Sequence, residues 1–170
     1  MDFDENTQKD FEAAKKLYAH LQAHGFHPLF EMSAGGDYKV HLWIFTRGCT
    51  AYEMRQFLQT VCADAGIKPH ELFPKQSALD SSKPYGNLVK LPLGLHLVTQ
   101  KMSVFLDDDF RSITDEQEVL VRLQYQLQNL DVIPHIETDA IDVDDVRKRL
   151  SKLAKGVDTV PSSQQDVTAD

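Results

Sequence analysis

Residues 33–45 read SAGGDYKVHLWIF, a small glycine-containing turn that leads into an alternating strand. Val40 and every second residue after it point to one face of this strand, while Lys39 and His41 lie together on the opposite face. A glycine pair lets backbone N–H groups approach a ligand closely, so the stretch favours binding of an anion such as a triphosphate. The alternative is a structural role, because Gly-Gly turns before strands are common and a strand histidine is usually structural. We expect Trp43 to pack in the core rather than to serve as a platform for a stacked base.

Helices are expected on both sides of this stretch, where apolar residues recur at three- and four-residue spacing. Gly25 supplies a stop for the first helix. Thr50 and Glu53 form a capping-box pattern at the start of the second helix, and Thr114 and Gln117 form the same pattern before the third. The expected helices cover residues 8–24, 51–65 and 115–129.

Alternating apolar segments between the helices predict strands. Two of these strands precede the second helix, and the last one runs directly into Asp107 and two further aspartates. The order of elements, a strand fragment followed by a helix, two strands and a helix, is typical of an α+β fold. The expected strands cover residues 26–32, 39–45, 87–91 and 102–106.

The composition is that of a globular protein. The 170 residues, 42% hydrophobic and 26% charged, are enough for one domain with a real core. No apolar run approaches the roughly 20 residues of a membrane span, so no membrane partner is expected. Cys49 and Cys62 fit neither a zinc site nor a disulfide framework, which favours a cytoplasmic location with reduced thiols. A net charge of −8 argues against a general nucleic-acid coat protein, but it does not exclude an enzyme that gathers carboxylates around metal ions.

Three aspartates have the chemistry of metal ligands. Asp2 and Asp4 flank one aromatic residue, so their carboxylates share a face if the segment is extended, and Asp107 follows the apolar run of residues 103–106. Two divalent ions about 3.5–4 Å apart, held by such carboxylates, can activate an attacking hydroxyl and stabilise a leaving pyrophosphate. The alternative is that residues 107–109 form a solvated acidic loop and that Asp2 belongs to a frayed terminus.

Taken in order, these motifs resemble those of the archaeo-eukaryotic primase superfamily, most closely the primase–polymerase domains of TOTE conflict systems and of some CRISPR-associated proteins. Asp2 and Asp4 match the Asp-x-Asp motif of that family, and Asp107 matches its single acid after an apolar strand. Residues 71–76 and 86–92 are similar to segments typical of the TOTE branch. The second family motif, a serine- and glycine-containing turn leading to a histidine strand, corresponds to Ser33, Gly35, Gly36 and His41.

The resemblance implies a metal-dependent nucleotidyltransferase on an RRM-like α+β core, with a mainly antiparallel sheet flanked by helices. Such an enzyme is a DNA primase or primase–polymerase, which adds nucleotides to a primer, or starts one, on a nucleic-acid template. The implied partners are nucleoside triphosphates and a DNA or RNA template-primer, with helicase or nuclease domains in the parent protein. The implied catalytic residues, which would hold two Mg²⁺ or Mn²⁺ ions, are Asp2, Asp4 and Asp107. The implied nucleotide-binding residues are Ser33, Gly35, Gly36, Lys39, His41, Lys75, Gln76, Asn87 and Lys90.

Several interpretations stay open. Two interpretations apply to four polar residues of the middle segments. They either line a nucleotide or template cleft, or belong to segments whose only role is packing. These residues are Lys75, Gln76, Asn87 and Lys90. The first motif starts at residue 2, where the family has a preceding apolar run, so we expect an N-terminally truncated catalytic core with weak or no activity. A catalytically inactive module that binds nucleotides or nucleic acid is the second function considered. A metal-dependent nuclease, which leaves the Ser-Gly-Gly turn unexplained, is the third.

The composition changes towards the end of the chain. Residues 144–155 carry several basic side chains in a short helical pattern, and the residues after Gly156 are rich in serine, aspartate, glutamine and threonine. We therefore expect a catalytic core over residues 1–130, a linker with a short basic helix over residues 131–156, and a disordered tail over residues 157–170.

Overall fold

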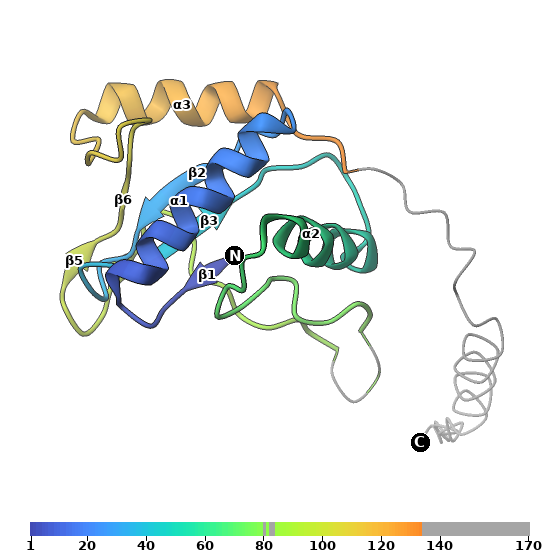
Figure 1. Cartoon of the computed structure of the whole chain (residues 1–170). Helices are drawn as coiled ribbons and strands as arrows, with labels where there is room; N and C mark the ends of the chain where they lie inside the picture. Colours follow the sequence, from blue (N-terminus) through green and yellow to red (C-terminus); the bar gives the residue numbers. More distant parts are fainter. Residues whose placement is uncertain (80, 82–83, 134–170) are drawn as a thin grey trace, which may run out of the picture. The chain divides into compact units, whose positions relative to one another are not determined.

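A four-stranded antiparallel sheet with the strand order β1-β3-β2-β6 lies at the centre of the fold (Figure 1). The computed structural model describes residues 1–79, 81 and 84–133, so the basic helix expected over residues 144–155 and the tail lie outside the described residues. Together with the helices around the sheet, this arrangement confirms the expected α+β fold. The strands are short: β1 is Asp2–Phe3, β2 is Leu29–Met32, β3 is Val40–Trp43 and β6 is Val104–Phe105.

Two rows of side chains cross the sheet on opposite faces. Asp2 lies opposite His41, His41 lies opposite Glu31, and Glu31 lies opposite Phe105. Val40, one step along β3 from His41, is buried on the other face, as the period of two in the sequence predicts. The row on that face consists of Phe3, Val40, Met32 and Val104.

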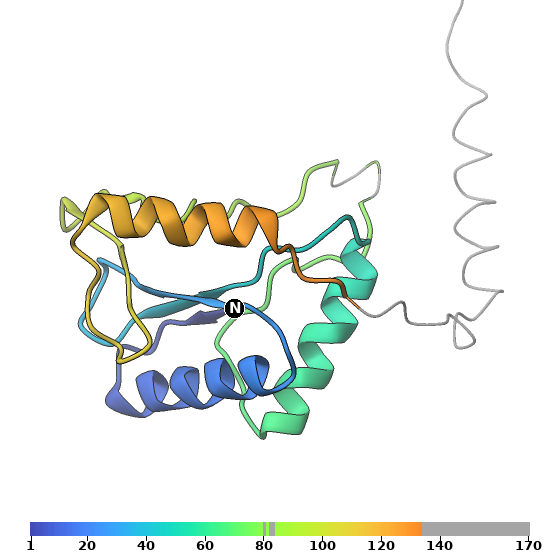
Figure 2. The ribbon, with the colours of Figure 1, turned by 90° about the horizontal axis from the view of Figure 1, so that it is seen from above.

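The helices cover the sheet from both sides. α1 (Gln8–Ala23) and α2 (Ala51–Ala65) pack with the Val40 face in the larger hydrophobic cluster, and α3 (Glu116–Gln128) packs with the opposite face in a smaller one. Figure 2 shows α1 and α3 on opposite sides of the sheet. Among the described residues, no helix combines the length and apolar character needed to cross a membrane. The helical side chains buried in the larger cluster include Leu17 and Leu21 of α1 and Phe57 and Leu58 of α2.

The helix ends follow the sequence signals, with one correction. At the start of α2, the Thr50 side chain accepts a hydrogen bond from the Glu53 amide and the Glu53 side chain accepts one from the Thr50 amide, so the predicted capping box is confirmed. Gly66 ends this helix in the left-handed conformation, with φ of 64°. The capping box expected at Thr114 is wrong by one residue: Asp115 is the N-cap, and its carboxylate accepts from the amide of residue 118. Aspartate caps a helix at least as well as threonine does, so Asp115 takes the N-cap position in place of the preceding Thr114.

Two expected strands differ from the prediction. Residues 87–91 form no strand: Leu88 is 99% exposed, and no neighbouring strand pairs with this segment. An alternating apolar pattern forms a strand only where another strand supplies hydrogen-bond partners. The strand expected over residues 102–106 is broken at the buried Ser103, whose amide donates to the carbonyl of Gly94 at 3.2 Å. On either side of the break, β5 (Lys101–Met102) pairs with β4 (Leu95–His96), and β6 joins the main sheet.

The first strand is held on both sides. β3 pairs with one side of β1. On the other side, the Asp2 amide donates to the carbonyl of Glu71 at 2.9 Å, and the His70 amide donates to the carbonyl of Asp2 at 2.8 Å. Residues 70–71 therefore form a short bridge along the outer side of β1.

Candidate functional site

Three titratable side chains from three neighbouring strands meet on one face of the sheet. His41 of β3 lies between Asp2 of β1 and Glu31 of β2. The Nδ1 of His41 is 3.0 Å from the Oε2 of Glu31, and its Nε2 is 3.5 Å from the Oδ1 of Asp2. The imidazole is thus held between two carboxylates, which restrict the orientation of the ring.

Glu31 is a fully buried acid, with 0% of its surface exposed. Its Oε2 also accepts a hydrogen bond from the Nε1 of Trp43 at 2.7 Å, and its Oε1 accepts one from the Leu93 amide at 2.6 Å. A buried carboxylate requires such partners, because transfer of an unpaired charge into the interior is very unfavourable. The sequence prediction missed Glu31, although an acid within the buried strand LFEM is a signal that could have found it.

Asp2 differs from Glu31 in having an oxygen without a partner. Burial raises the pKa of Asp2 above its usual value, the neighbouring His41 opposes that rise, and the nearby Asp4 adds to it. The Oδ1 atom is buried yet accepts no hydrogen bond, since the contact with His41 lacks hydrogen-bond geometry. Perturbed carboxyl groups with open acceptor positions are typical of functional sites.

The other members of the first two motifs are engaged nearby. Asp4 is exposed, and its Oδ1 forms an ion pair with the Nζ of Lys39 at 2.7 Å. A Cβ atom on Gly36 would come within 2.4 Å of the side chain of Asn6, and one on Gly35 within 3.1 Å of that of His96. The turn is therefore packed closely against neighbouring side chains. The motif residues that do not line the pocket described next are Asp4, Ser33, Gly35, Gly36 and Lys39.

A pocket of about 670 Å³ opens beside β1 and β3. Met54 and Leu58 of α2 also line it, and the rest of its wall comes from two segments, residues 71 and 73–76 and residues 86–91. The side chain of Gln76 donates a hydrogen bond to that of Asn87, which joins the two parts of this wall. Trp43 is half-buried and packs against the smaller core cluster, as expected, but it also lines the pocket. The predicted site residues that line the pocket are Asp2, His41, Lys75, Gln76, Asn87 and Lys90.

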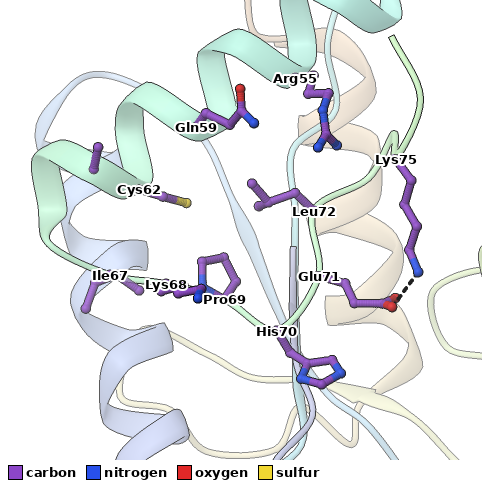
Figure 3. Close-up of a pocket in the computed structure, with 11 residues that line it drawn as sticks. Arg55, Gln59, Cys62, Ile67, Lys68, Pro69, His70, Glu71, Leu72 and Lys75 are labelled. Atoms are coloured by element: carbon purple, nitrogen blue, oxygen red, sulfur yellow. Dashed lines mark hydrogen bonds and ion pairs between the residues drawn. The ribbon is translucent and has the colours of Figure 1, made fainter. Parts of the chain in front are cut away.

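A second pocket, of about 530 Å³, lies between α2 and residues 67–75 (Figure 3). Glu71 and Lys75, which form an ion pair drawn in Figure 3, line both pockets, so their segment separates the two. Burial raises the pKa of the Cys62 thiol in its lining to about 11, which keeps the thiol protonated and unreactive at neutral pH. Basic groups surround this second pocket: Arg55, Lys68, His70 and Lys75.

Asp107 lies away from the first pocket, in the turn after β6. Its carboxylate accepts hydrogen bonds from the amide of Asp109 at 2.9 Å and from the amide of Arg111 at 2.8 Å. The pKa of Asp107 is lowered below its usual value, mainly by the hydrogen bond from the Arg111 amide. The guanidinium of Arg111 lowers it further.

The three acids predicted to bind two metal ions are not brought together. β1 and β6 are the opposite edges of the sheet, and three strand spacings of about 4.8 Å place these edges about 14 Å apart. Among residues 1–79, 81 and 84–133, no group of three or more histidine, cysteine, aspartate or glutamate side chains is arranged to hold a metal ion. The unpartnered Oδ1 of Asp2 would suit a cation. However, Asp4 is paired with Lys39, and the carboxylate of Asp107 accepts hydrogen bonds from the backbone of the turn that contains it. This arrangement does not fit a two-ion site with Asp2, Asp4 and Asp107 as ligands.

The fold and site define an α+β domain with a pocket beside a histidine-bearing strand. The family described as the TOTE conflict system, Archaeo-Eukaryotic Primase domain, matches residues 1–131. The chain therefore belongs to this family of primase-like nucleotidyltransferases, which confirms the resemblance noted in the sequence. No curated protein matches the chain.

Proposed function

We propose that this domain is a nucleotidyltransferase of the DNA primase or primase–polymerase type. It binds a nucleoside triphosphate in the pocket beside β1 and β3, and adds the nucleotide to a primer, or starts one, on a DNA or RNA template. One observation carries this proposal: six residues predicted from separate parts of the sequence line a single pocket. Family membership supports the class of reaction.

The pocket has the size and chemistry of a nucleotide site. Its volume of about 670 Å³ lies within the range of roughly 300–1,000 Å³ for small-molecule sites. In this proposal, His41, Lys75 and Lys90 interact with the phosphates, since phosphoryl transfer depends mainly on alignment and on stabilisation of developing charge. Trp43 and Phe73 offer aromatic surface to the base.

The proposal keeps two Mg²⁺ or Mn²⁺ ions as cofactors, but assigns them no step, because the described acids do not form a ligand set. It also keeps the remaining expectations: a template-primer as partner, helicase or nuclease domains in the parent protein, and a cytoplasmic location. Each of these is inferred from the family resemblance or the composition.

A second candidate function is nucleotide or nucleic-acid binding without catalysis. The observation that favours it is the separation of Asp107 from Asp2. Asp2 lies on the edge strand β1, whereas Asp107 follows β6 at the opposite edge of the sheet. A pocket with this geometry can bind a triphosphate through its basic groups. Among the residues that the structure describes, no cluster of three carboxylates stands beside it to hold two metal ions.

Extension of a labelled primer on DNA and RNA templates tests the proposal, with Mn²⁺ or Mg²⁺ and all four nucleotides. Lys90→Ala removes a basic group from the pocket, and Lys101→Ala is the matched control, because that exposed lysine lies outside the pocket lining. We expect at least weak product from the parent chain and from Lys101→Ala, and a loss of product from Lys90→Ala.

The other outcomes separate the candidates. Nucleotide binding without product from the parent chain favours the binding module, and shortening of the primer indicates a nuclease. Equal product from both variants would contradict the assigned pocket, provided that circular dichroism shows both to be folded. If the parent chain shows neither nucleotide binding nor product, both candidate functions are overturned.

A further inference from the structure

Glu31 has no assigned role in the proposed function, yet it occupies a central position next to the pocket. It is the most completely buried charged residue in the described part of the chain. Its two carboxylate oxygens accept hydrogen bonds from two different parts of the structure: Oε2 binds the side chains of His41 and Trp43 on β3, and Oε1 binds the backbone of Leu93.

The hydrogen bond to His41 fixes which ring nitrogen faces the pocket. The Nδ1 of His41 lies 3.0 Å from the buried Oε2 of Glu31, and an ionised carboxylate there would make Nδ1 the donor, because such a group only accepts. The ring is thereby oriented with Nε2 directed towards Asp2, 3.5 Å away, where both residues line the pocket. A carboxylate that orients a functional histidine in this way is a recurrent arrangement in protein sites.

The hydrogen bond to Leu93 holds the other wall of the pocket. Leu93 has a φ of 59°, a left-handed conformation that is unfavourable for a leucine and persists only where surrounding contacts enforce it. Its amide donates to the Oε1 of Glu31 at 2.6 Å, and its side chain packs into the smaller core cluster. Close by in the chain, the Nζ of Lys90 donates to the Oγ of the buried Ser103 at 2.5 Å. The segment that carries Asn87 and Lys90 is therefore anchored to the sheet through Glu31 and Ser103.

We propose that Glu31 is a positioning residue that couples the two walls of the pocket. It keeps the proton of His41 on Nδ1, so that Nε2 faces the pocket, and it holds the left-handed turn at Leu93 that places Lys90 opposite β3. The effect on nucleotide transfer rests on the proposed function, whereas the effects on His41 and Leu93 do not.

The test uses NMR of the ¹⁵N-labelled full chain without any nucleotide. In the parent protein, the long-range nitrogen–proton spectrum of His41 must show a protonated Nδ1. An unprotonated Nδ1 would overturn the proposal, whatever the variants do. The first variant, Glu31→Gln, preserves the shape of the side chain but replaces one acceptor oxygen with a donor amide.

In Glu31→Gln, the amide group cannot accept from His41, Trp43 and Leu93 together. We expect the His41 proton to redistribute towards Nε2, and the Leu93 amide to exchange with solvent at least about tenfold faster. If Glu31→Gln does not fold, Glu31→Asp, which keeps the charge but shortens the reach, serves the same comparison. A folded variant with an unchanged His41 tautomer and unchanged Leu93 protection contradicts the proposal.

The matched control is Asp131→Asn. Asp131 is also a buried acid that binds a histidine, with its Oδ1 2.8 Å from the Nδ1 of His27, but it lies outside the pocket. We expect Asp131→Asn to alter His27 and to leave His41 and Leu93 unchanged. Changes at His41 in this control would mean that general destabilisation explains the effect.

A kinetic readout links the inference to the proposed function. If the parent chain transfers nucleotides, Glu31→Gln should lower kcat by about 10- to 100-fold, with a smaller change in KM. An inactive parent chain would refute the proposed function, yet the NMR comparison would still decide the role of Glu31. The two failures are therefore distinguishable.

Discussion

Asp2 and His41 face each other across β1 and β3, with the Oδ1 of the aspartate 3.5 Å from the Nε2 of the histidine. The same Oδ1 is buried and accepts no hydrogen bond. Burial raises the pKa of Asp2, so the charged form of this residue opposes folding. A carboxyl group with a raised pKa beside a pocket is an arrangement that is common in functional sites.

Asp2→Asn should therefore stabilise the protein at neutral pH. The pKa of Asp2 is higher in the folded protein than its ordinary value of 3.8, so the ionised group destabilises the fold above the folded-state pKa. The advantage of the variant should shrink as the pH falls through the folded-state pKa, and it should vanish below 3.8, where the parent carboxyl is protonated in both states. Thermal unfolding at several pH values measures this, with Asp37→Asn, at an exposed aspartate that does not affect the pKa of Asp2, as the control. A variant less stable than the parent at pH 7 would contradict the prediction.

Asp107→Asn should show the opposite pH dependence. The pKa of Asp107 is lowered in the folded protein, chiefly by the hydrogen bond from the Arg111 amide, so its charge stabilises the fold above the ordinary value of 3.8. This contribution is lost as the pH falls through the folded-state pKa. The variant should thus be less stable than the parent at pH 7 and should approach it in acid. The same set of unfolding curves checks this, and equal curves at pH 7 would count against it.

Thr50→Ala should destabilise the protein by about 1 kcal/mol, because the threonine hydroxyl caps the first turn of α2. The urea midpoint should fall while the slope of the transition stays the same. Thr60→Ala is the control, since this exposed threonine lies within the same helix and alanine favours helix. Equal losses in both variants would show that the cap contributes nothing specific.

Phe30→Ala should cost about 3–5 kcal/mol, a large part of the stability of a small domain. Phe30 is buried and makes edge-on contacts with Phe11, Tyr18 and Phe110, which join β2 to α1 and to the turn after β6. Leu88→Ala, at a fully exposed leucine, should change stability by no more than about 0.5 kcal/mol. Urea denaturation of both variants measures the contrast, and similar losses would contradict the assigned core.

Nucleotide binding should change the fluorescence of Trp43, which is the only tryptophan in the chain and lines the pocket. Lys90→Ala should weaken the binding of a nucleoside triphosphate by about tenfold, through loss of a charged contact with the phosphates. Lys101→Ala should bind as the parent does. A saturable signal that is identical in the three proteins would place the nucleotide elsewhere.

Local sequence signals predicted the local structure well. Thr50 and Glu53 determine the start of α2, because each partner of a capping box lies within one turn of the other. The same rule failed by one residue at α3, where Thr114 and Asp115 are both good caps. The strand expected over residues 87–91 failed for a different reason, since its partner would have to come from elsewhere in the chain.

Long-range features were the ones that local patterns could not supply. Asp2 and Asp107 both border apolar strands, but no periodicity encodes that β1 and β6 are opposite edges of the sheet. The gathering of Lys75, Gln76, Asn87 and Lys90 around the pocket was suggested only through the family resemblance. Glu31 was missed because its partners lie 10, 12 and 62 residues away in the chain.

The bridge between β1 and residues 70–71 joins the floor of the pocket to its wall, because the same short segment continues through Glu71 to Lys75. Because Lys75 lines the pocket, a ligand that contacts it also contacts the segment whose backbone keeps Asp2 in the sheet. A ligand that binds only the paired form should stabilise the pairing between β1 and residues 70–71. We therefore expect the amide of Asp2 to exchange with solvent more slowly as the ligand concentration rises.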